Sequence, residues 1–335
     1  MTLDVYTRLL RIEARLIQLE LSHHPQPNPL HEEWTRQSGW KIGKVPLLRH
    51  SALYSCGNKT VVSYKLMIEW TILAAREWNK FSASTPQMSS FLKSSVFVSE
   101  VEESIVPLAH FVSFLRTRNR EDLKLSIQVY DVCSGKGFLS ALLSFLKILL
   151  PEFDVHGVDV VTMVDSHFDR MNLFHVGFLN DVFVPLGALP IRVLSLSIFS
   201  HAFEEHLLRR SMPNSAVALL GIHLCRRLSP RMIYLHQHCC RSLFMFLGPC
   251  CLPPKSTAII DCGSIKIDPM QVHLKEDSYE FWVKQLYNVI LTPRFKKDLI
   301  RVPLHGGPHR CNVFIEAQGV STSRTERNWR WIGST

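Results

Sequence analysis

Residues 129–140 have the sequence VYDVCSGKGFLS. β-Branched and aromatic residues lead up to Asp131, glycines follow at Gly135 and Gly137, and the apolar residues after them recur at helical spacing. This order predicts a strand, a tight turn and a helix. Glycine permits a positive φ and lets a ligand approach the backbone, while the N–H groups at a helix start favour electron-rich groups. The stretch therefore predicts a cofactor-binding turn.

Short apolar strands alternate with helices around this turn. Strands are expected at residues 127–131, 154–159, 191–196, 216–222, 243–247, 258–267 and 312–316, and helices at residues 139–150, 226–241 and 279–290. Such alternation produces βαβ units. The sequence therefore predicts an α/β fold with a Rossmann-like, mostly parallel sheet flanked by helices. Residues 1–120 have mostly helical spacing and are expected to form a helical N-terminal region, residues 121–320 the domain that contains this sheet, and residues 321–335 a basic flexible tail.

A second acidic residue, Asp159, is expected at the tip of the neighbouring strand. There its carboxylate would accept hydrogen bonds from ribose hydroxyls, as in nucleotide-cofactor folds. A dinucleotide site requires G-x-G-x-x-G, but Ser140 stands at the third glycine position, and the phosphate-loop pattern G-x-x-x-x-G-K-[ST] is absent. A dehydrogenase is therefore disfavoured, while a turn that needs glycine only for packing stays open.

Three segments resemble one branch of the class I S-adenosylmethionine-dependent methyltransferases. Residues 131–140 (DVCSGKGFLS) resemble the branch's D-x-G-S-G-K-G-Y-L-S signature, residues 220–225 (LGIHLC) its G-x-H-x-C-G segment, and residues 248–255 (GPCCLPPK) its Cys-Cys segment. The branch includes methyltransferase-25-like proteins and the tRNA 2′-O-methyltransferases that act on the acceptor stem, and the resemblance covers residues 85–317. It implies a methyltransferase that uses S-adenosylmethionine, with RNA, tRNA included, as the first substrate class and protein as the second.

The resemblance also implies roles for individual residues. The cofactor would contact Asp131, Cys133, Ser134, Gly135, Gly137 and Asp159, and the catalytic candidates are His223, Cys250 and Cys251, expected at the carboxyl ends of the central strands. Methyl transfer from a sulfonium needs alignment more than acid–base chemistry, so no catalytic dyad is required.

Two positions depart from the branch's pattern. Cys133 stands at the first glycine of the loop, and Arg226 at the glycine after H-x-C. Side chains at these positions narrow the cofactor cleft and alter the neighbouring turn. They leave open an alternative from another class, a pseudo-methyltransferase that binds RNA or protein without catalysis.

The composition indicates a folded, basic protein. The chain has 335 residues, 46% of them hydrophobic, and 38 Lys and Arg against 29 Asp and Glu leave a net charge of +9. That excess suits a polyanion such as RNA, and arginines interleaved with Trp329 and Trp331 near the end of the chain could contact phosphates and bases. The longest apolar runs, residues 139–150 and 191–199, are shorter than the ~20 residues of a spanning helix, so no membrane span is expected. The sequence does not indicate the oligomeric state.

The chain's nine cysteines are odd in number and include two adjacent pairs. This argues against a secreted disulfide framework and favours the cytoplasm or nucleus. Cys225, Cys250 and Cys251, together with His223 and His236, raise the question of zinc. No C-x₂-C pair faces a second such pair at finger spacing, so the sequence predicts no metal and treats the thiols as small apolar side chains.

Overall fold

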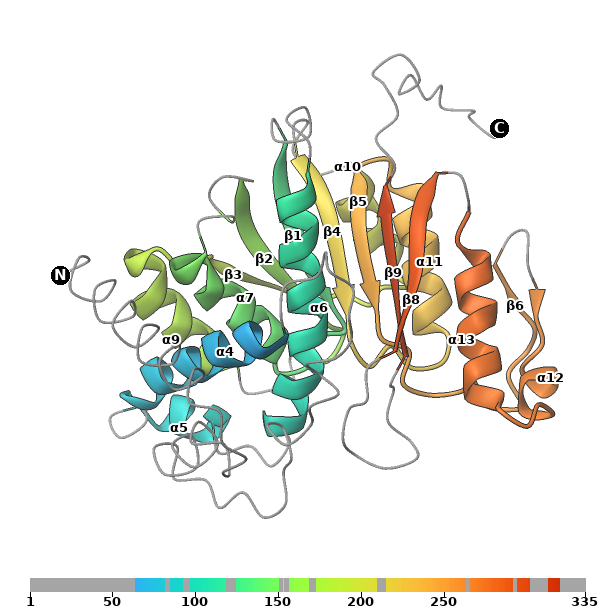
Figure 1. The fold of residues 1–335 in the computed structure, drawn as a ribbon, viewed down its shortest axis with the longest axis horizontal. Helices are drawn as coiled ribbons and strands as arrows, with labels where there is room; N and C mark the ends of the chain where they lie inside the picture. Colours follow the sequence, from blue (N-terminus) through green and yellow to red (C-terminus); the bar gives the residue numbers. More distant parts are fainter. Residues whose placement is uncertain are drawn as a thin grey trace, which may run out of the picture.

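A seven-stranded sheet forms the centre of the computed structural model (Figure 1). In spatial order its strands are β3 (Ile191–Leu194), β2 (Val158–Val164), β1 (Ser126–Val132), β4 (Ser215–Gly221), β5 (Ser242–Leu247), β9 (Val313–Gly319) and β8 (Phe295–Arg301). The structure describes residues 64–81, 85–92, 97–118, 125–150, 153, 157–168, 173–209, 215–262, 266–291, 294–301 and 313–319. Strands β1 to β5 pair in parallel, whereas β9 runs antiparallel between β5 and β8. The predicted α/β fold with a mostly parallel sheet is confirmed.

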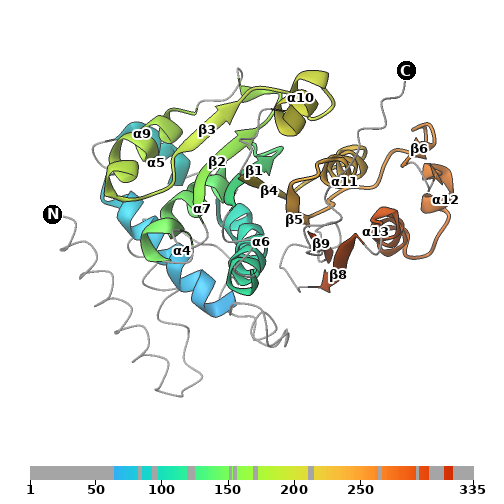
Figure 2. The ribbon, with the colours of Figure 1, turned by 90° about the horizontal axis from the view of Figure 1, so that it is seen from above.

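Helices cover both faces of the sheet (Figure 2). One face carries α4 (Tyr64–Asn79), α5 (Pro86–Leu92), α6 (Phe97–Thr117), α7 (Phe138–Leu149) and α9 (Phe174–Phe183), the last continued by the short 3₁₀ helix Val184–Leu186. The other carries α10 (His201–Arg209), α11 (Leu228–His238) and α13 (Ser278–Val289). Alternate residues of β1 therefore enter different cores: Val129 packs in the first cluster and Tyr130 in the second.

The amino-terminal helices belong to the same core as the sheet. The ring of Trp78 in α4 lies 6.0 Å from that of Phe145 in α7. In α6, His110 Nδ1 lies 2.5 Å from Glu316 Oε2 of β9, and both side chains are buried. Within the predicted N-terminal region, residues 1–63 lie outside the described residues, as does the predicted tail, residues 321–335. None of the described helices is long and apolar enough to cross a membrane.

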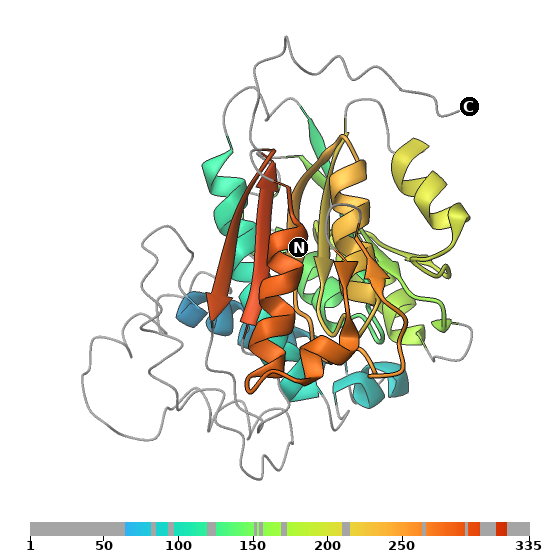
Figure 3. The ribbon, with the colours of Figure 1, turned by 90° about the vertical axis from the view of Figure 1, so that its right-hand side faces the viewer.

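The strand predictions need correction in two places, and one strand was missed. The second strand is Val158–Val164, which follows Gly157 at φ +61° and continues past the predicted end at residue 159; of the predicted range, residues 154–156 lie outside the described residues. Of residues 258–267, those that the structure describes contain the two-residue strands β6 (Ile260–Asp261) and β7 (Lys266–Ile267), next to the short helix α12 (Pro269–His273). Strand β8 was not predicted, because its lysines and arginine are typical of an exposed edge (Figure 3).

Candidate functional site

The turn between β1 and α7 has the backbone that its glycines predict. Gly135 and Gly137 have φ values of +52° and +77°. The Gly137 N–H donates to Ser134 O at 2.8 Å, and the Ala141 N–H donates to Gly137 O at 2.8 Å, so the turn leads directly into the first turn of α7. The Ser134 N–H donates to Val164 O at 3.2 Å, which ties the turn to the end of β2. The turn thus lies at the carboxyl edge of the parallel strands, where open α/β sheets bind ligands.

The carboxylate at the tip of β2 is that of Asp165. Its Oδ2 accepts the Gly135 N–H at 3.2 Å, its Oδ1 accepts the His167 N–H at 3.0 Å, and its side chain is 14% exposed. A carboxylate offers about four lone-pair directions, so these two bonds leave acceptor capacity at the edge of the turn. Asp165 therefore occupies the strand-tip position that the sequence predicts for Asp159.

The assignment of Asp159 to a strand tip is wrong. Asp159 is the second residue of β2, is exposed, and lies about 20 Å from Asp165 along the strand. It occupies the amino edge of the sheet, away from the glycine turn. The signal that distinguishes the two carboxylates is the apolar run Val160–Val164, which shows that the strand continues past Asp159.

Two observations show that the turn fits a polar ligand. The Ser134 Oγ is buried without a hydrogen-bond partner, although buried hydroxyls are nearly always paired. A Cβ placed on Gly135 would meet no atom within 4 Å, so there is open space beside the backbone. At Gly137, in contrast, a Cβ would lie 2.4 Å from Met163 Cε. Gly135 therefore borders space that a cofactor could occupy, while Gly137 is needed for packing.

Asp131 lies behind the turn and not in the open space. The side chain is 2% exposed, and its Oδ2 accepts the Ser140 hydroxyl at 2.7 Å. Burial raises the pKa of Asp131 to about 7, against the opposing effect of the Ser140 hydrogen bond. Asp131 thus holds the start of α7 against β1, and any contact it makes with a cofactor comes from the buried side of the turn.

Non-glycine residues with a left-handed backbone also lie at the carboxyl edge of the sheet. Among the described residues, three such positions occur, Cys133, His223 and Arg226, with φ values of +58°, +61° and +56°. Two of them, Cys133 and Arg226, are the positions where the branch that the sequence resembles has glycine. The conformation costs about 1–2 kcal/mol per residue, and strain of this kind is concentrated at functional sites. Burial also raises the pKa of the Cys133 thiol to about 12, so Cys133 is a poor nucleophile.

Replacing Arg226 by glycine is expected to stabilise the protein by about 1 kcal/mol, because the relief of left-handed strain exceeds the added flexibility of the unfolded chain. Urea unfolding measures the change. Arg227→Gly is the matched control, since Arg227 is exposed like Arg226 but has a helical φ of −71°. That control should lose roughly 0.5 kcal/mol. Equal effects at the two positions would contradict the assignment of strain to Arg226.

The three predicted catalytic residues all follow central strands. His223 comes two residues after β4, and its Nε2 lies 2.7 Å from Glu103 Oε2 and 3.7 Å from Glu100 Oε1, both on α6. Cys250 and Cys251 follow β5. Cys250 forms a disulfide with Cys225, and Cys251 is exposed, with its Sγ 3.2 Å from Cys225 Sγ. The pairing of His223 with Glu103 was not predicted, because the two residues are far apart in the chain.

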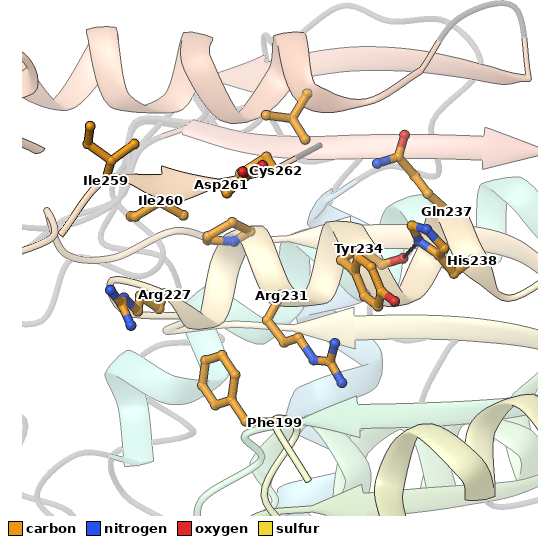
Figure 4. Close-up of a pocket in the computed structure, with 12 residues that line it drawn as sticks. Phe199, Arg227, Arg231, Tyr234, Gln237, His238, Ile259, Ile260, Asp261 and Cys262 are labelled. Atoms are coloured by element: carbon orange, nitrogen blue, oxygen red, sulfur yellow. Dashed lines mark hydrogen bonds between the residues drawn. The ribbon is translucent and has the colours of Figure 1, made fainter. Parts of the chain in front are cut away.

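A cavity of about 530 Å³ lies along α11 (Figure 4). None of the residues that line this cavity belongs to the glycine turn. Two of them, Phe199 and Arg227, follow β3 and β4, so this end of the cavity lies near the carboxyl edge of the sheet. Phe199 is 52% exposed and Tyr234 39% exposed. The Arg231 guanidinium lies 4.8 Å from the Tyr234 ring and donates to Glu204 Oε2 at 2.7 Å. Arginines and exposed rings thus line one groove, which the sequence analysis did not identify.

Comparison with known proteins found no matching family model and no matching curated protein. Several solved structures are similar in fold. An rRNA methylase from Streptococcus thermophilus is 13% identical over 64% of this chain and 97% of its own, with a TM-score of 0.33. The methyltransferase domain of a bacterial Hen1 is 11% identical over 64% and 97%, with a TM-score of 0.36. The DszA carbon methyltransferase is 14% identical over 87% and 71%, with a TM-score of 0.40. Because these sequence identities and TM-scores are low, the function has to be argued from the residues of the site.

Proposed function

We propose that the protein is an S-adenosylmethionine-dependent methyltransferase that acts on RNA. The observation that carries the cofactor proposal is the buried, unpartnered Ser134 hydroxyl next to the open space at Gly135. Ser134, Gly135 and the Asp165 carboxylate are the groups assigned to hold the cofactor. The sheet counts against a dinucleotide cofactor. The dinucleotide-binding fold has strand order 3-2-1-4-5-6, whereas here the last strand, β9, is inserted antiparallel between β5 and β8.

When bound, the cofactor supplies a methyl group already activated by its sulfonium. The chain must then align a nucleophile and accept its proton. We assign the proton to the imidazole of His223, which the carboxylate of Glu103 orients at 2.7 Å. The position of His223 supports the assignment, because this residue follows β4 at the carboxyl edge of the sheet, where the glycine turn also lies.

The α11 groove supports RNA as the substrate class. Exposed aromatic rings stack on unpaired bases, and arginines contact phosphates. Arg227, Phe199 and Tyr234 provide both kinds of group in one cavity. The net charge of +9 favours the same polyanion.

The test is methyl transfer from labelled S-adenosylmethionine to RNA and protein fractions, together with calorimetric binding of S-adenosylhomocysteine. Label is expected in RNA, and Asp165→Ala should weaken cofactor binding at least about tenfold, as the loss of a charged acceptor does. Asp159→Ala, a carboxylate on the same strand at the opposite edge, is the matched control and should bind like the natural protein. Cofactor binding with label only in protein would contradict the RNA proposal. RNA binding without cofactor binding would instead identify a pseudo-methyltransferase, the alternative that Cys133 and Arg226 favour.

A further inference from the structure

We propose that Cys225, Cys250 and Cys251, when reduced, form a three-thiolate zinc site beside the candidate catalytic edge. Their Sγ atoms all lie within 4.8 Å of one another. Cys251 Sγ lies 3.2 Å from Cys225 Sγ and 3.6 Å from Cys250 Sγ, while Cys225 and Cys250 are joined as a disulfide. The disulfide accounts for two of the sulfurs. It does not explain why the third sulfur, that of Cys251, lies close to both of them.

The two loops that carry the thiols are held together by their backbones. The Leu224 N–H donates to Gly248 O at 3.1 Å, the Gly248 N–H donates to Gly221 O at 2.8 Å, and the Arg226 N–H donates to Cys251 O at 3.4 Å. The Tyr279 hydroxyl donates to Pro249 O at 2.5 Å from α13. Because these bonds do not involve sulfur, the loops keep the three thiols together when the disulfide is reduced.

The chemistry of the cluster selects a soft divalent cation. Three adjacent thiolates repel one another unless a cation lies between them, and thiolates are preferred ligands of zinc. Cys251 is exposed, and Cys225 and Cys250 are partly exposed, which provides the entry path that a metal site requires. Within the described part of the chain, no fourth His, Cys, Asp or Glu joins the cluster. Three protein ligands leave the fourth position of a tetrahedral zinc open to water or a substrate atom.

The two forms of the cluster are related by a balanced reaction. A dithiol reductant transfers two electrons and two protons to the Cys225–Cys250 disulfide and becomes a disulfide itself. The three thiols then bind Zn²⁺ and release three protons as their sulfurs become ligands. The disulfide is therefore the oxidised, zinc-free form of the same site.

Titration of the reduced full-length chain with zinc against a chromophoric chelator tests the proposal. One zinc per chain is expected, and cobalt in its place should give the thiolate-to-metal charge-transfer absorption of a sulfur-rich site. Serine at Cys225, Cys250 or Cys251 should each weaken zinc binding at least about a hundredfold, because even changes behind a ligand cost ten- to hundredfold. Cys240→Ser, an exposed cysteine outside the cluster, is the matched control and should bind zinc normally.

The outcome for Cys251 separates a metal site from a simple disulfide. Cys251→Ser keeps both disulfide partners, so undiminished zinc binding by this variant would overturn the proposal, as would the absence of stoichiometric binding by the reduced natural protein. If the serine variants do not fold, a second measurement on the natural protein tests the proposal. Oxidation of the natural protein should expel zinc, and reduction should restore zinc binding. Neither measurement involves methyl transfer, so this proposal and the proposed function fail independently.

Discussion

Replacing Gly137 by alanine is expected to destabilise the protein by about 3 kcal/mol, the sum of left-handed strain and overpacking less the entropy that alanine removes from the unfolded chain. The added Cβ would lie 2.4 Å from Met163 Cε and 2.7 Å from Met163 Sδ. Met163 is fully buried, so its end cannot move into solvent. Urea unfolding measures the loss.

The matched control for this change is Gly135→Ala. Gly135 has a similar positive φ, but its Cβ would meet nothing, so only the strain of about 1–2 kcal/mol remains. That variant should fold and yet bind S-adenosylhomocysteine more weakly, because the methyl group enters the space assigned to the cofactor. A cost at Gly137 no larger than at Gly135, or one that does not shrink in a Met163→Val background, would show that the clash with Met163 is not the cause.

Exchanging Asp131 for asparagine is expected to remove a large pH dependence of stability. Burial raises the pKa of Asp131 from 3.8 to about 7 in the folded protein. Between pH 4 and pH 7 the folded state therefore binds more protons at this group than the unfolded state does, so the free energy of unfolding falls as pH rises through that window. Three pKa units correspond to a loss on the order of 4 kcal/mol, which the asparagine variant lacks.

The pH profile of stability of the natural protein minus that of Asp131→Asn isolates the contribution of the Asp131 carboxyl group. Burial lowers the pKa of His236 from 6.5 to about 3, and this group makes stability rise with pH between those values. That opposing contribution is common to the natural protein and to Asp131→Asn, so it cancels. Parallel curves for the natural protein and Asp131→Asn between pH 4 and pH 8 would contradict the raised pKa.

Two departures from the branch that the sequence resembles have a structural meaning. Cys133 and Arg226 stand where that branch has glycine, and both adopt the left-handed backbone that glycine adopts at no cost. The turns after β1 and β4 therefore have a backbone that favours glycine, although neither position holds it.

The cysteines illustrate how far spacing can mislead. Cys225 is separated from Cys250 by 25 residues, and no paired C-x₂-C motif signals a metal. The sequence predicts Cys250 and Cys251 at the carboxyl ends of central strands, but it indicates neither a disulfide nor a metal there and treats the thiols as small apolar side chains. Strands β4 and β5 pair in parallel, so the loops after them meet, and the three sulfurs come together.

The sequence by itself determined the strand–turn–helix at residues 129–140, the alternation that makes the sheet, and the need for glycine at Gly135 and Gly137. These features depend on φ preferences and side-chain periodicity, which act between near neighbours in the chain. Only the tertiary structure decided that the Asp165 carboxylate accepts the Gly135 N–H, that Glu103 pairs with His223, and that Cys251 lies beside a Cys225–Cys250 disulfide. Those contacts join residues that are far apart in the chain, and side-chain periodicity acts only between near neighbours.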